Sequence, residues 1–281
     1  MIDFKIAAII PARMASSRYP GKPLININGL PMIEHVRRRV VLCQDFCKVV
    51  VATCDIEIKD VVEQFGGEVV MTSKQHLAAS DRVAEAAQSI DCTHIVNVQG
   101  DEILVLPENL NRLIKSIKNH PNEEFWNATS PINTEKDLAD ESIVKCVISK
   151  SDRIIFCSRD FSFVPKSENF QAIRMILGII AYNRHSLLNY NKLPRTPMEE
   201  IFSIDQFRII ENDVPLLAVF FPKGYIGINN PYEESQVKNI LSNDPSPYLQ
   251  QHKNNPVQWQ TWNEDSLNLA KAQKKPILLS I

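Results

Sequence analysis

The stretch that decides the fold is Ile6-Ala7-Ala8-Ile9-Ile10-Pro11-Ala12-Arg13-Met14-Ala15-Ser16-Ser17-Arg18-Tyr19-Pro20-Gly21-Lys22-Pro23-Leu24. Its first five residues form an apolar run that is typical of a buried β-strand. The loop that follows carries three cations, and open α/β sheets bind their ligands at the carboxyl ends of their strands. Arginine as a bidentate fork and lysine as a point charge both suit a polyphosphate. Two interpretations stay open from these residues alone: a nucleotide-phosphate loop, or a solvated basic turn.

Short apolar runs and helical spacing alternate beyond this loop. Strands are expected at 49–53, 69–71, 95–98, 144–148, 154–157, 175–182 and 216–221, and helices at 31–42, 56–65, 81–90, from 107, at 198–210 and at 231–240. Asp55 and Ser80 are the predicted N-caps of the second and third of these helices. The alternation predicts an α/β fold with a mostly parallel sheet, and the consecutive strands in the middle predict an antiparallel insertion.

Composition limits the classes of function. The chain has 281 residues and a net charge of -2, which argues against a general nucleic-acid partner. No apolar run approaches the roughly 20 residues that a membrane-spanning helix needs. The amino terminus lacks the pattern of a signal peptide, so we expect a cytoplasmic protein without a membrane partner.

The cysteines give only a weak metal signal. The chain has six, without a Cys-x-x-Cys pair, and Cys43, Cys47 and His35 are close enough in sequence for a metal site to be imagined. In a reducing compartment, packed free thiols are the favoured interpretation.

Three loops follow predicted strands and are expected to meet at one edge of the sheet. They are the opening loop, Gln99-Gly100-Asp101-Glu102, and the segment that contains Asn229. Asp101 would face the cationic loop, where a carboxylate can hold Mg²⁺ together with substrate phosphates; the alternative is that it caps a turn. Asn229 could add a neutral oxygen. The motifs GxxxxGK[ST], GxGxxG and GxSxG are absent from the sequence, so neither a P-loop nor a dinucleotide fold is expected.

Several motifs together resemble the 3-deoxy-manno-octulosonate cytidylyltransferases over about residues 4–241. They are Ile9-Ile10-Pro11-Ala12-Arg13 through Gly21-Lys22-Pro23-Leu24, Pro31-Met32-Ile33-Glu34-His35-Val36, Val51-Ala52-Thr53, Phe65-Gly66-Gly67-Glu68-Val69-Val70-Met71-Thr72-Ser73, Ser80-Asp81-Arg82, Val96-Asn97-Val98-Gln99-Gly100-Asp101-Glu102, Ser158-Arg159, Leu177-Gly178-Ile179 and Asp205-Gln206-Phe207-Arg208. The resemblance implies a Rossmann-like nucleotidyltransferase core, with the antiparallel insertion used for sugar binding and dimerisation. It also implies Mg²⁺, a homodimer, and transfer of CMP from CTP to the anomeric hydroxyl of an acidic sugar, with release of pyrophosphate for lipopolysaccharide or surface polysaccharide synthesis.

The resemblance also implies roles for individual residues. The expected catalytic residues are Arg13, Lys22 and Asp101, and the expected metal ligands are Asp101 and Asn229. The nucleotide would contact Pro11, Ala12, Arg13, Ser17, Lys22, Thr53, His76, Ser80 and Arg82. The sugar would contact Gln99, Arg159, Tyr182, Asp205 and Gln206.

Some positions depart from the family pattern. Leu77 stands where the family has glutamine near the base, and Ile176 and Ile180 replace polar residues expected at the sugar. Asn229 replaces the second metal-binding aspartate, and Ile103 replaces a proline. A polar substrate group left without its partner costs on the order of 1–3 kcal/mol. We therefore keep two alternatives: a related acidic sugar as substrate, or a weakened nucleotide-binding paralogue.

Residues 242–281 form a predicted second unit, set off by a break at 242–247 that contains two prolines. They resemble the start of a thioredoxin-like domain of the spermatogenesis-associated protein 20 type. A piece of about 40 residues cannot build its own core. We expect it to pack on the main domain or to be partly disordered, without redox activity.

Overall fold

The computed structural model describes residues 4–15, 19–76, 78–132, 134–161, 172–222 and 224. Its central sheet has the strand order β11-β7-β10-β6-β1-β4-β5. These strands are β1 (Ile6–Ala12), β4 (Lys48–Thr53), β5 (Glu68–Met71), β6 (His94–Val98), β7 (Phe125–Pro131), β10 (Ile173–Asn183) and β11 (Leu216–Phe220). β1 pairs in parallel with β4 and β6, whereas β10 runs antiparallel between β6 and β7. The predicted α/β class with a mostly parallel sheet is confirmed.

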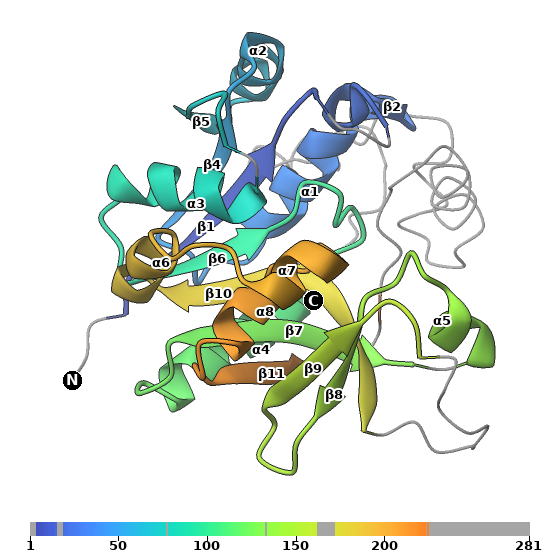
Figure 1. Ribbon diagram of the computed structural model, residues 1–281. Coiled ribbons are helices and arrows are strands. Elements are labelled where there is room, and N and C mark those ends of the chain that lie inside the picture. The colour runs from blue at the N-terminus through green and yellow to red at the C-terminus, as the bar shows by residue number, and fades with distance from the viewer. Residues whose placement is uncertain are drawn as a thin grey trace, which may run out of the picture.

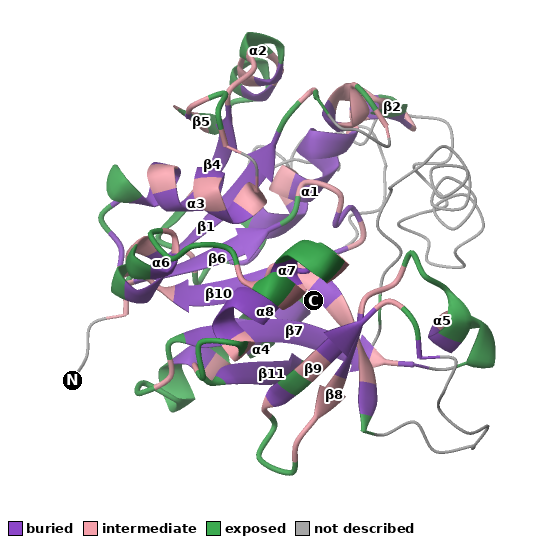
Figure 2. Cartoon of the chain, viewed as in Figure 1, coloured by how far each residue is buried: buried purple, intermediate pink, exposed green. Residues whose placement is uncertain are grey.

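Helices cover both faces of this sheet (Figure 1). On one face lie α1 (Met32–Val41), α2 (Ile56–Gln64) and α4 (Pro107–Asn119); on the other lie α3 (Ala79–Gln88), α6 (Arg184–Tyr190) and α8 (Gln206–Ile210). β1 shows why: Ile6, Ala8 and Ile10 join the first core and Ala7 and Ile9 the second. A strand buried on both faces reads as a continuous apolar run, and Figure 2 shows the central strands buried.

The predicted antiparallel insertion is also present. β8 (Lys145–Ile148) and β9 (Ile154–Ser158) form a hairpin, and β8 pairs with the first residues of β10. The hairpin lies beside α5 (Glu135–Ala139) at one end of the sheet (Figure 1). A separate small core of Ile132, Leu138, Phe161 and Ile173 supports it.

Four short elements of the described chain remain, and the first of them ends the opening loop. They are η1 (Lys22–Leu24), β2 (Asn26–Ile27), β3 (Leu30–Pro31) and α7 (Pro197–Phe202). The opening loop thus ends in a turn of 3₁₀ helix that begins after Gly21, whose φ of 74° is a left-handed conformation that glycine adopts without strain.

Of the two N-cap predictions, Ser80 is wrong, whereas Asp55 occupies the predicted N-cap position without a capping hydrogen bond. The helix predicted to start after Ser80 starts two residues earlier, at Ala79, so Ser80 lies inside α3. The Asp81 side chain accepts a hydrogen bond from the backbone N–H of Ala78 at 3.1 Å, which stabilises the helix start instead. Asp55 does precede α2, but its carboxylate accepts a hydrogen bond from the Met14 N–H at 2.8 Å and makes no capping bond. At α2 a tertiary contact has thus replaced the local one, whereas at α3 another residue of the first turn supplies the local bond.

The structure also differs from the prediction in one helix and one strand. The helix expected at 198–210 is broken into α7 and α8, because Ser203 adopts a left-handed conformation with φ of 51°. β7 was not predicted, since its sequence Phe-Trp-Asn-Ala-Thr-Ser-Pro mixes polar and apolar residues even though most of it is buried. The helix expected at 231–240 lies outside the described residues.

The six cysteines are free thiols, as predicted. Among the described residues, no helix is both long and apolar enough to cross a membrane. The same part of the chain contains no cluster of three or more His, Cys, Asp or Glu side chains placed to hold a metal ion, and the Sγ of Cys43 instead donates to the Asn111 side chain at 2.8 Å.

Two buried histidines predict that the fold is sensitive to acid. Burial lowers the pKa of both His35 and His94 from about 6.5 to about 4. The unfolded chain therefore binds more protons between these pH values, so the free energy of unfolding falls as the pH drops from 6.5 to 4. At about 1.4 kcal/mol per pKa unit, each histidine accounts for about 3 kcal/mol. Denaturant titrations at stepped pH should show this loss; His94→Gln should remove about half of it, and His120→Gln, at an exposed position, should leave it unchanged.

Candidate functional site

A cavity of about 110 Å³ opens at the carboxyl end of β1. Its walls come from the end of that strand and from the start of α3. The lining residues are Pro11, Ala12, Arg13, His76, Ala78, Ala79 and Arg82. Five of these seven are among the residues predicted to contact the nucleotide, although they are separated by more than 60 positions in the sequence.

Arg82 forms one wall of the cavity and is held in place by two neighbouring strand ends. Its guanidinium donates to the hydroxyl of Thr72 and to the Sγ of Cys54, the latter at 3.4 Å. The Thr72 N–H in turn donates to the Thr53 carbonyl at 2.8 Å. Thr53 itself is buried and does not line the cavity; its carbonyl binds Thr72, which is the partner of Arg82.

His76 forms another wall and is oriented by a carboxylate. Its Nε2 hydrogen-bonds to Glu85, whose same oxygen accepts the Ser73 N–H at 2.9 Å. The hydrogen bond from Ser73, together with His76, holds the pKa of Glu85 below its usual value. A carboxylate at Nε2 fixes that nitrogen as the donor, which leaves Nδ1 for other contacts.

The opening loop is tied to the rest of the sheet edge by two acidic residues. Lys22 Nζ and Asp101 Oδ2 lie 2.7 Å apart, and their side chains are only 12% and 18% exposed. Asp55 binds the loop at Met14, as described above. Arg13, at the cavity, is exposed. At Lys22 the loop is not a solvated basic turn, because this side chain is paired and largely buried.

The turn from Gln99 to Glu102 lies against both this loop and β10. Gly100 approaches β1 so closely that a Cβ there would be 2.9 Å from the Pro11 carbonyl oxygen. The Glu102 side chain is buried and accepts the Gly178 N–H at 2.6 Å. Burial, and then the nearby charge of Asp101, raise the pKa of Glu102 to about 8. The side chain of Gln99 is exposed, as a ligand-binding residue requires.

Asp205 and Gln206 reach the same region from the start of α8, and both already have protein partners. The Ser80 hydroxyl donates to Asp205 Oδ2 at 3.3 Å, and burial raises the pKa of that carboxyl. The amide of Gln206 donates to Asn127 Oδ1 at 2.8 Å. Ser80 therefore connects α3, which borders the cavity, to α8.

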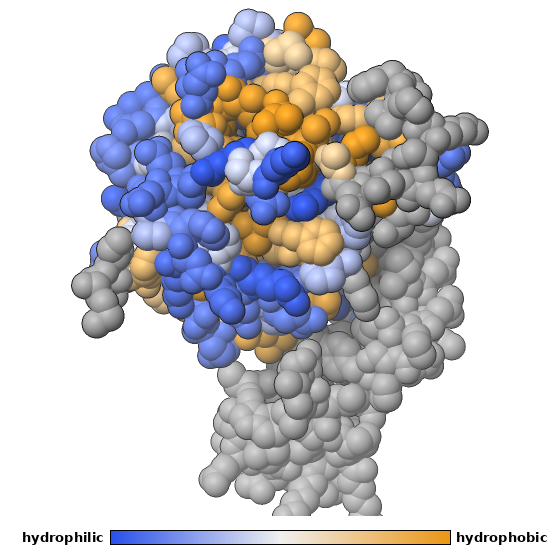
Figure 3. All heavy atoms as spheres, turned by 90° about the horizontal axis from the view of Figure 1, so that it is seen from below, coloured by the Kyte–Doolittle hydropathy of each residue, from blue (hydrophilic) through white to orange (hydrophobic). Residues whose placement is uncertain are grey.

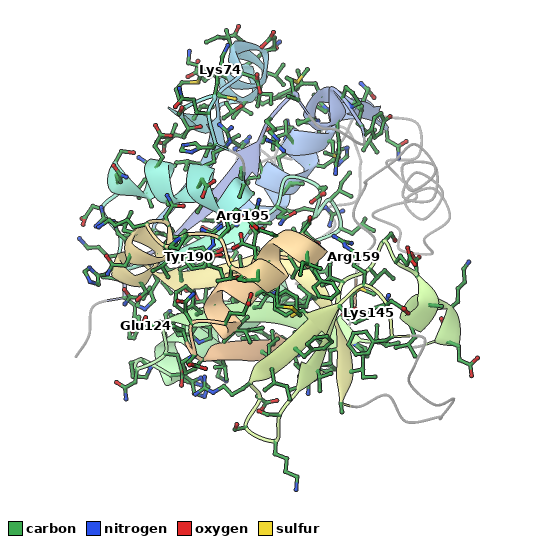
Figure 4. The ribbon with its side chains drawn as sticks, viewed as in Figure 1. Lys74, Glu124, Lys145, Arg159, Tyr190 and Arg195 are labelled. Carbon is green, nitrogen blue, oxygen red and sulfur yellow. The ribbon has the colours of Figure 1, made fainter. Side chains whose placement is uncertain are left out.

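The remaining predicted sugar residues lie in different environments. Arg159 donates to the Glu141 and Ser142 carbonyls, both at 3.2 Å, and its own carbonyl accepts from Lys145 at 2.6 Å (Figure 4). Tyr182 is 3% exposed and packs edge-on against Phe125. Its placement within the second core does not bring it to the cavity. Ser17 and Asn229 lie outside the described residues.

Sequence reasoning missed Glu85 and Asn127 as parts of the site. Both act through another residue: Glu85 orients His76, and Asn127 binds Gln206. The only signal available was the helical spacing that puts Glu85 three residues after Arg82 on the same helix face.

Three comparisons relate the chain to known proteins. The family model described as Cytidylyltransferase matches residues 7–216. The curated 3-deoxy-manno-octulosonate cytidylyltransferase of Trichlorobacter lovleyi is 34% identical over 83% of this chain and 97% of its own length. The 8-amino-3,8-dideoxy-manno-octulosonate cytidylyltransferase of Shewanella loihica is 36% identical over 74% of this chain and 86% of its own length.

Solved structures agree with these matches. A CMP:2-keto-3-deoxy-manno-octonic acid synthetase complexed with CTP superposes with a TM-score of 0.80 at 29% identity, over 85% of this chain and 99% of the other. A cytidylyltransferase from Leptospira borgpetersenii shares the fold at a TM-score of 0.60 and 17% identity, over 97% of this chain and 96% of the other.

The open α/β sheet, the cavity at the end of β1 and the paired Lys22 and Asp101 define, with these matches, a nucleotidyltransferase. The chain belongs to the cytidylyltransferase family, as the family model and the curated relatives show. Residues 238–281 match a second model, described as a protein of unknown function, DUF255, which agrees with the predicted resemblance of the tail to a different family. The predicted boundary at 242 lies outside the described residues.

Proposed function

We propose that this chain transfers CMP from CTP to the anomeric hydroxyl of 3-deoxy-manno-octulosonate or a closely related acidic sugar and releases pyrophosphate. The observation that carries the proposal is the Lys22–Asp101 pair, which stands beside a cavity lined by Arg13 and Arg82. The names of the curated relatives and the CTP bound to the similar solved structure support it.

The residues at this edge suit attack on a phosphorus atom. Such a reaction is catalysed mainly by positioning and by neutralising the charge that develops on the phosphate oxygens. Lys22 and Arg13 supply positive charge, while His76 and Arg82 line the cavity that would take the nucleoside part of CTP. Lys22 is already held near its working position by Asp101, which lowers the cost of ordering it when the nucleotide binds.

Asp101 fits the role of a magnesium ligand. Its donors are hard carboxylate oxygens at a partly open edge, and Mg²⁺ is usually held by one or two carboxylates together with substrate phosphates. When bound, the ion would neutralise phosphate charge and orient the triphosphate. Asp101 would hold it, and Asn229 remains the proposed second oxygen donor.

The sugar side favours a test of more than one substrate. Ile176 is half-buried and Ile180 is 7% exposed. Because both side chains are apolar, neither can form a hydrogen bond where the family has polar groups. The polar groups proposed for the carboxylate and hydroxyls of the sugar are those of Gln99, Arg159, Asp205 and Gln206. The 8-amino relative shows that the sugar differs within this family.

The setting of the reaction is part of the proposal. Lipopolysaccharide or surface polysaccharide synthesis in the cytoplasm is the context in which such an activated sugar is used. A homodimer through the insertion is supported by the exposed apolar side chain of Ile155 on β9, at 53%, and by Phe220 on the sheet-edge strand β11, at 45%. Figure 3 shows hydrophobic atoms gathered on the face seen from below, with hydrophilic atoms around them.

Pyrophosphate release tests the proposal directly. The full chain is assayed with CTP, Mg²⁺ and either 3-deoxy-manno-octulosonate or its 8-amino-8-deoxy analogue, with UTP as the control nucleotide. We expect release with CTP and at least one of these sugars, and loss of it when EDTA removes the metal. Binding of CTP without release of pyrophosphate in the presence of either sugar would instead support the weakened paralogue.

A further inference from the structure

β10 contains a bulge next to the Gln99–Glu102 turn. Ile176 pairs with Thr129 and Ile180 with Asn127, so β10 advances four residues while β7 advances two. Leu177, Gly178 and Ile179 are therefore displaced from the regular ladder, and bulges of this kind redirect backbone groups near functional sites.

The buried amide of Asn127 satisfies part of the displaced backbone. Its Nδ2 donates to the carbonyls of Leu177 at 3.1 Å and Ile179 at 3.2 Å. Asn127 is fully buried, and its Oδ1 accepts from Gln206. The bulge thus has a defined shape, since each of these polar groups has a partner.

The backbone carbonyl and N–H of Gly178 both form hydrogen bonds with the Gln99–Glu102 turn. The Gln99 N–H donates to the Gly178 carbonyl at 2.8 Å, and the Gly178 N–H donates to Glu102 Oε1 at 2.6 Å. The turn is closed on itself by the Glu102 N–H, which donates to the Gln99 carbonyl at 3.0 Å. The side-chain oxygen of Glu102 thus accepts the hydrogen bond that a backbone carbonyl of a neighbouring strand would otherwise accept from the Gly178 N–H.

The fit around this contact is tight. A Cβ at Gly178 would lie 2.7 Å from Glu102 Oε1 and 3.1 Å from the Gln99 side chain. Glu102 is 7% exposed, and its second oxygen has no hydrogen-bond partner. Burying a carboxyl group with one unpaired oxygen costs free energy. The hydrogen bond that Glu102 makes with Gly178 explains why a long acidic side chain is buried here.

We propose that Glu102 is a positioning residue: through Gly178 it fixes the turn so that Asp101, its neighbour in sequence, stays opposite Lys22. The proposal rests on the proposed function, because it assigns Asp101 and Lys22 to the triphosphate. The other side of the turn is fixed by Gly100 against the Pro11 carbonyl. Asp101 is thus held between two fixed neighbours, with the 2.7 Å contact to Lys22 as the result.

Two substitutions separate positioning from a role for the ionisable carboxyl group of Glu102. Glu102→Gln keeps the length and an oxygen that accepts from Gly178, but removes the carboxyl group. Glu102→Asp keeps the carboxyl group and loses one methylene of reach. Positioning predicts that the Gln variant retains kcat within about threefold, whereas the Asp and Ala variants lose about 10- to 100-fold with a smaller change in the KM for CTP. Glu57→Ala, at an exposed position on α2, serves as the control.

Amide hydrogen exchange provides a readout that does not need activity. The Gly178 amide should be protected in the wild type and in Glu102→Gln, and should exchange faster in Glu102→Asp and Glu102→Ala. Retained activity in Glu102→Asp with loss in Glu102→Gln, or unchanged Gly178 exchange in Glu102→Ala, would overturn the proposal. A wild-type chain without transferase activity would reject the proposed function instead, while the exchange measurement would still decide whether Glu102 holds the bulge.

Discussion

Lys22→Ala is expected to lower kcat/KM for CTP by about 10²- to 10³-fold, the effect typical of removing one preorganised donor from a developing negative charge. Lys22 is the basic side chain of the described loop that is both largely buried and held at a fixed distance from the sheet edge, 2.7 Å from Asp101. A charge that is already oriented needs little reorganisation when the substrate binds. Pyrophosphate release under saturating sugar measures the loss.

The control for this prediction is Lys115→Ala, which removes an exposed lysine from α4. It should leave kcat/KM within about twofold. A thermal melt of each variant separates lost chemistry from lost folding, because Lys22→Ala also leaves the carboxylate of Asp101 without its partner. Equal activity of the two variants would mean that the triphosphate lies elsewhere.

The parts of the site that follow strands could be predicted from the sequence. The apolar run before Pro11 indicates a buried strand, and the carboxyl ends of parallel strands meet at one edge, so Arg13, Lys22 and Asp101 were expected to lie near one another. Lys22 and Asp101 are 2.7 Å apart, and Arg13 lines the cavity. Periodicity was sufficient because both faces of this sheet are covered by helices.

Contacts between distant polar side chains could not be predicted in the same way. Nothing in the sequence around Asn127 indicates that its amide fills a bulge 50 residues away, and the strand that contains it was missed. Ser80 has the local pattern of an N-cap, yet its hydroxyl binds Asp205, 125 residues further along the chain. Local propensity was outweighed at both positions by a tertiary hydrogen bond.

The largest expected effect on stability comes from Glu199→Gln. Glu199 is fully buried and accepts two hydrogen bonds from Arg208, at 2.7 and 2.5 Å, and one from Arg195 at 3.1 Å. Burial alone would raise the pKa of Glu199, but the bonds from Arg208 and Arg195 outweigh it and lower the pKa. Removing one partner of a buried pair typically costs about 3–5 kcal/mol, since the other charge stays buried without compensation.

The pH dependence of this variant provides an internal check. Because the pKa of Glu199 is lowered in the folded state, its contribution to stability is present above the pKa of an unfolded glutamate and is lost as the pH falls through the folded value. The difference in unfolding free energy between wild type and Glu199→Gln should therefore be largest near neutral pH and shrink in acid. Glu200→Gln, at the exposed neighbouring position, should show neither effect.

Glu199→Gln should also weaken binding of the sugar. Arg208 lies on α8 with Asp205 and Gln206 at the start of that helix, and its guanidinium lies over the Tyr190 ring, 4.7 Å from the ring centroid. We expect loosening of α7 from α8 to disturb the hydrogen bond from Gln206 to Asn127, whereas Lys22 is held by Asp101, which lies outside both helices. Below its melting temperature, Glu199→Gln should therefore raise the KM for the sugar several-fold more than the KM for CTP. An equal rise in the KM for CTP and the KM for the sugar would contradict the placement of the sugar at α8. General unfolding cannot mimic the expected result, because it lowers the amount of active enzyme, and hence the maximal rate, without changing either KM.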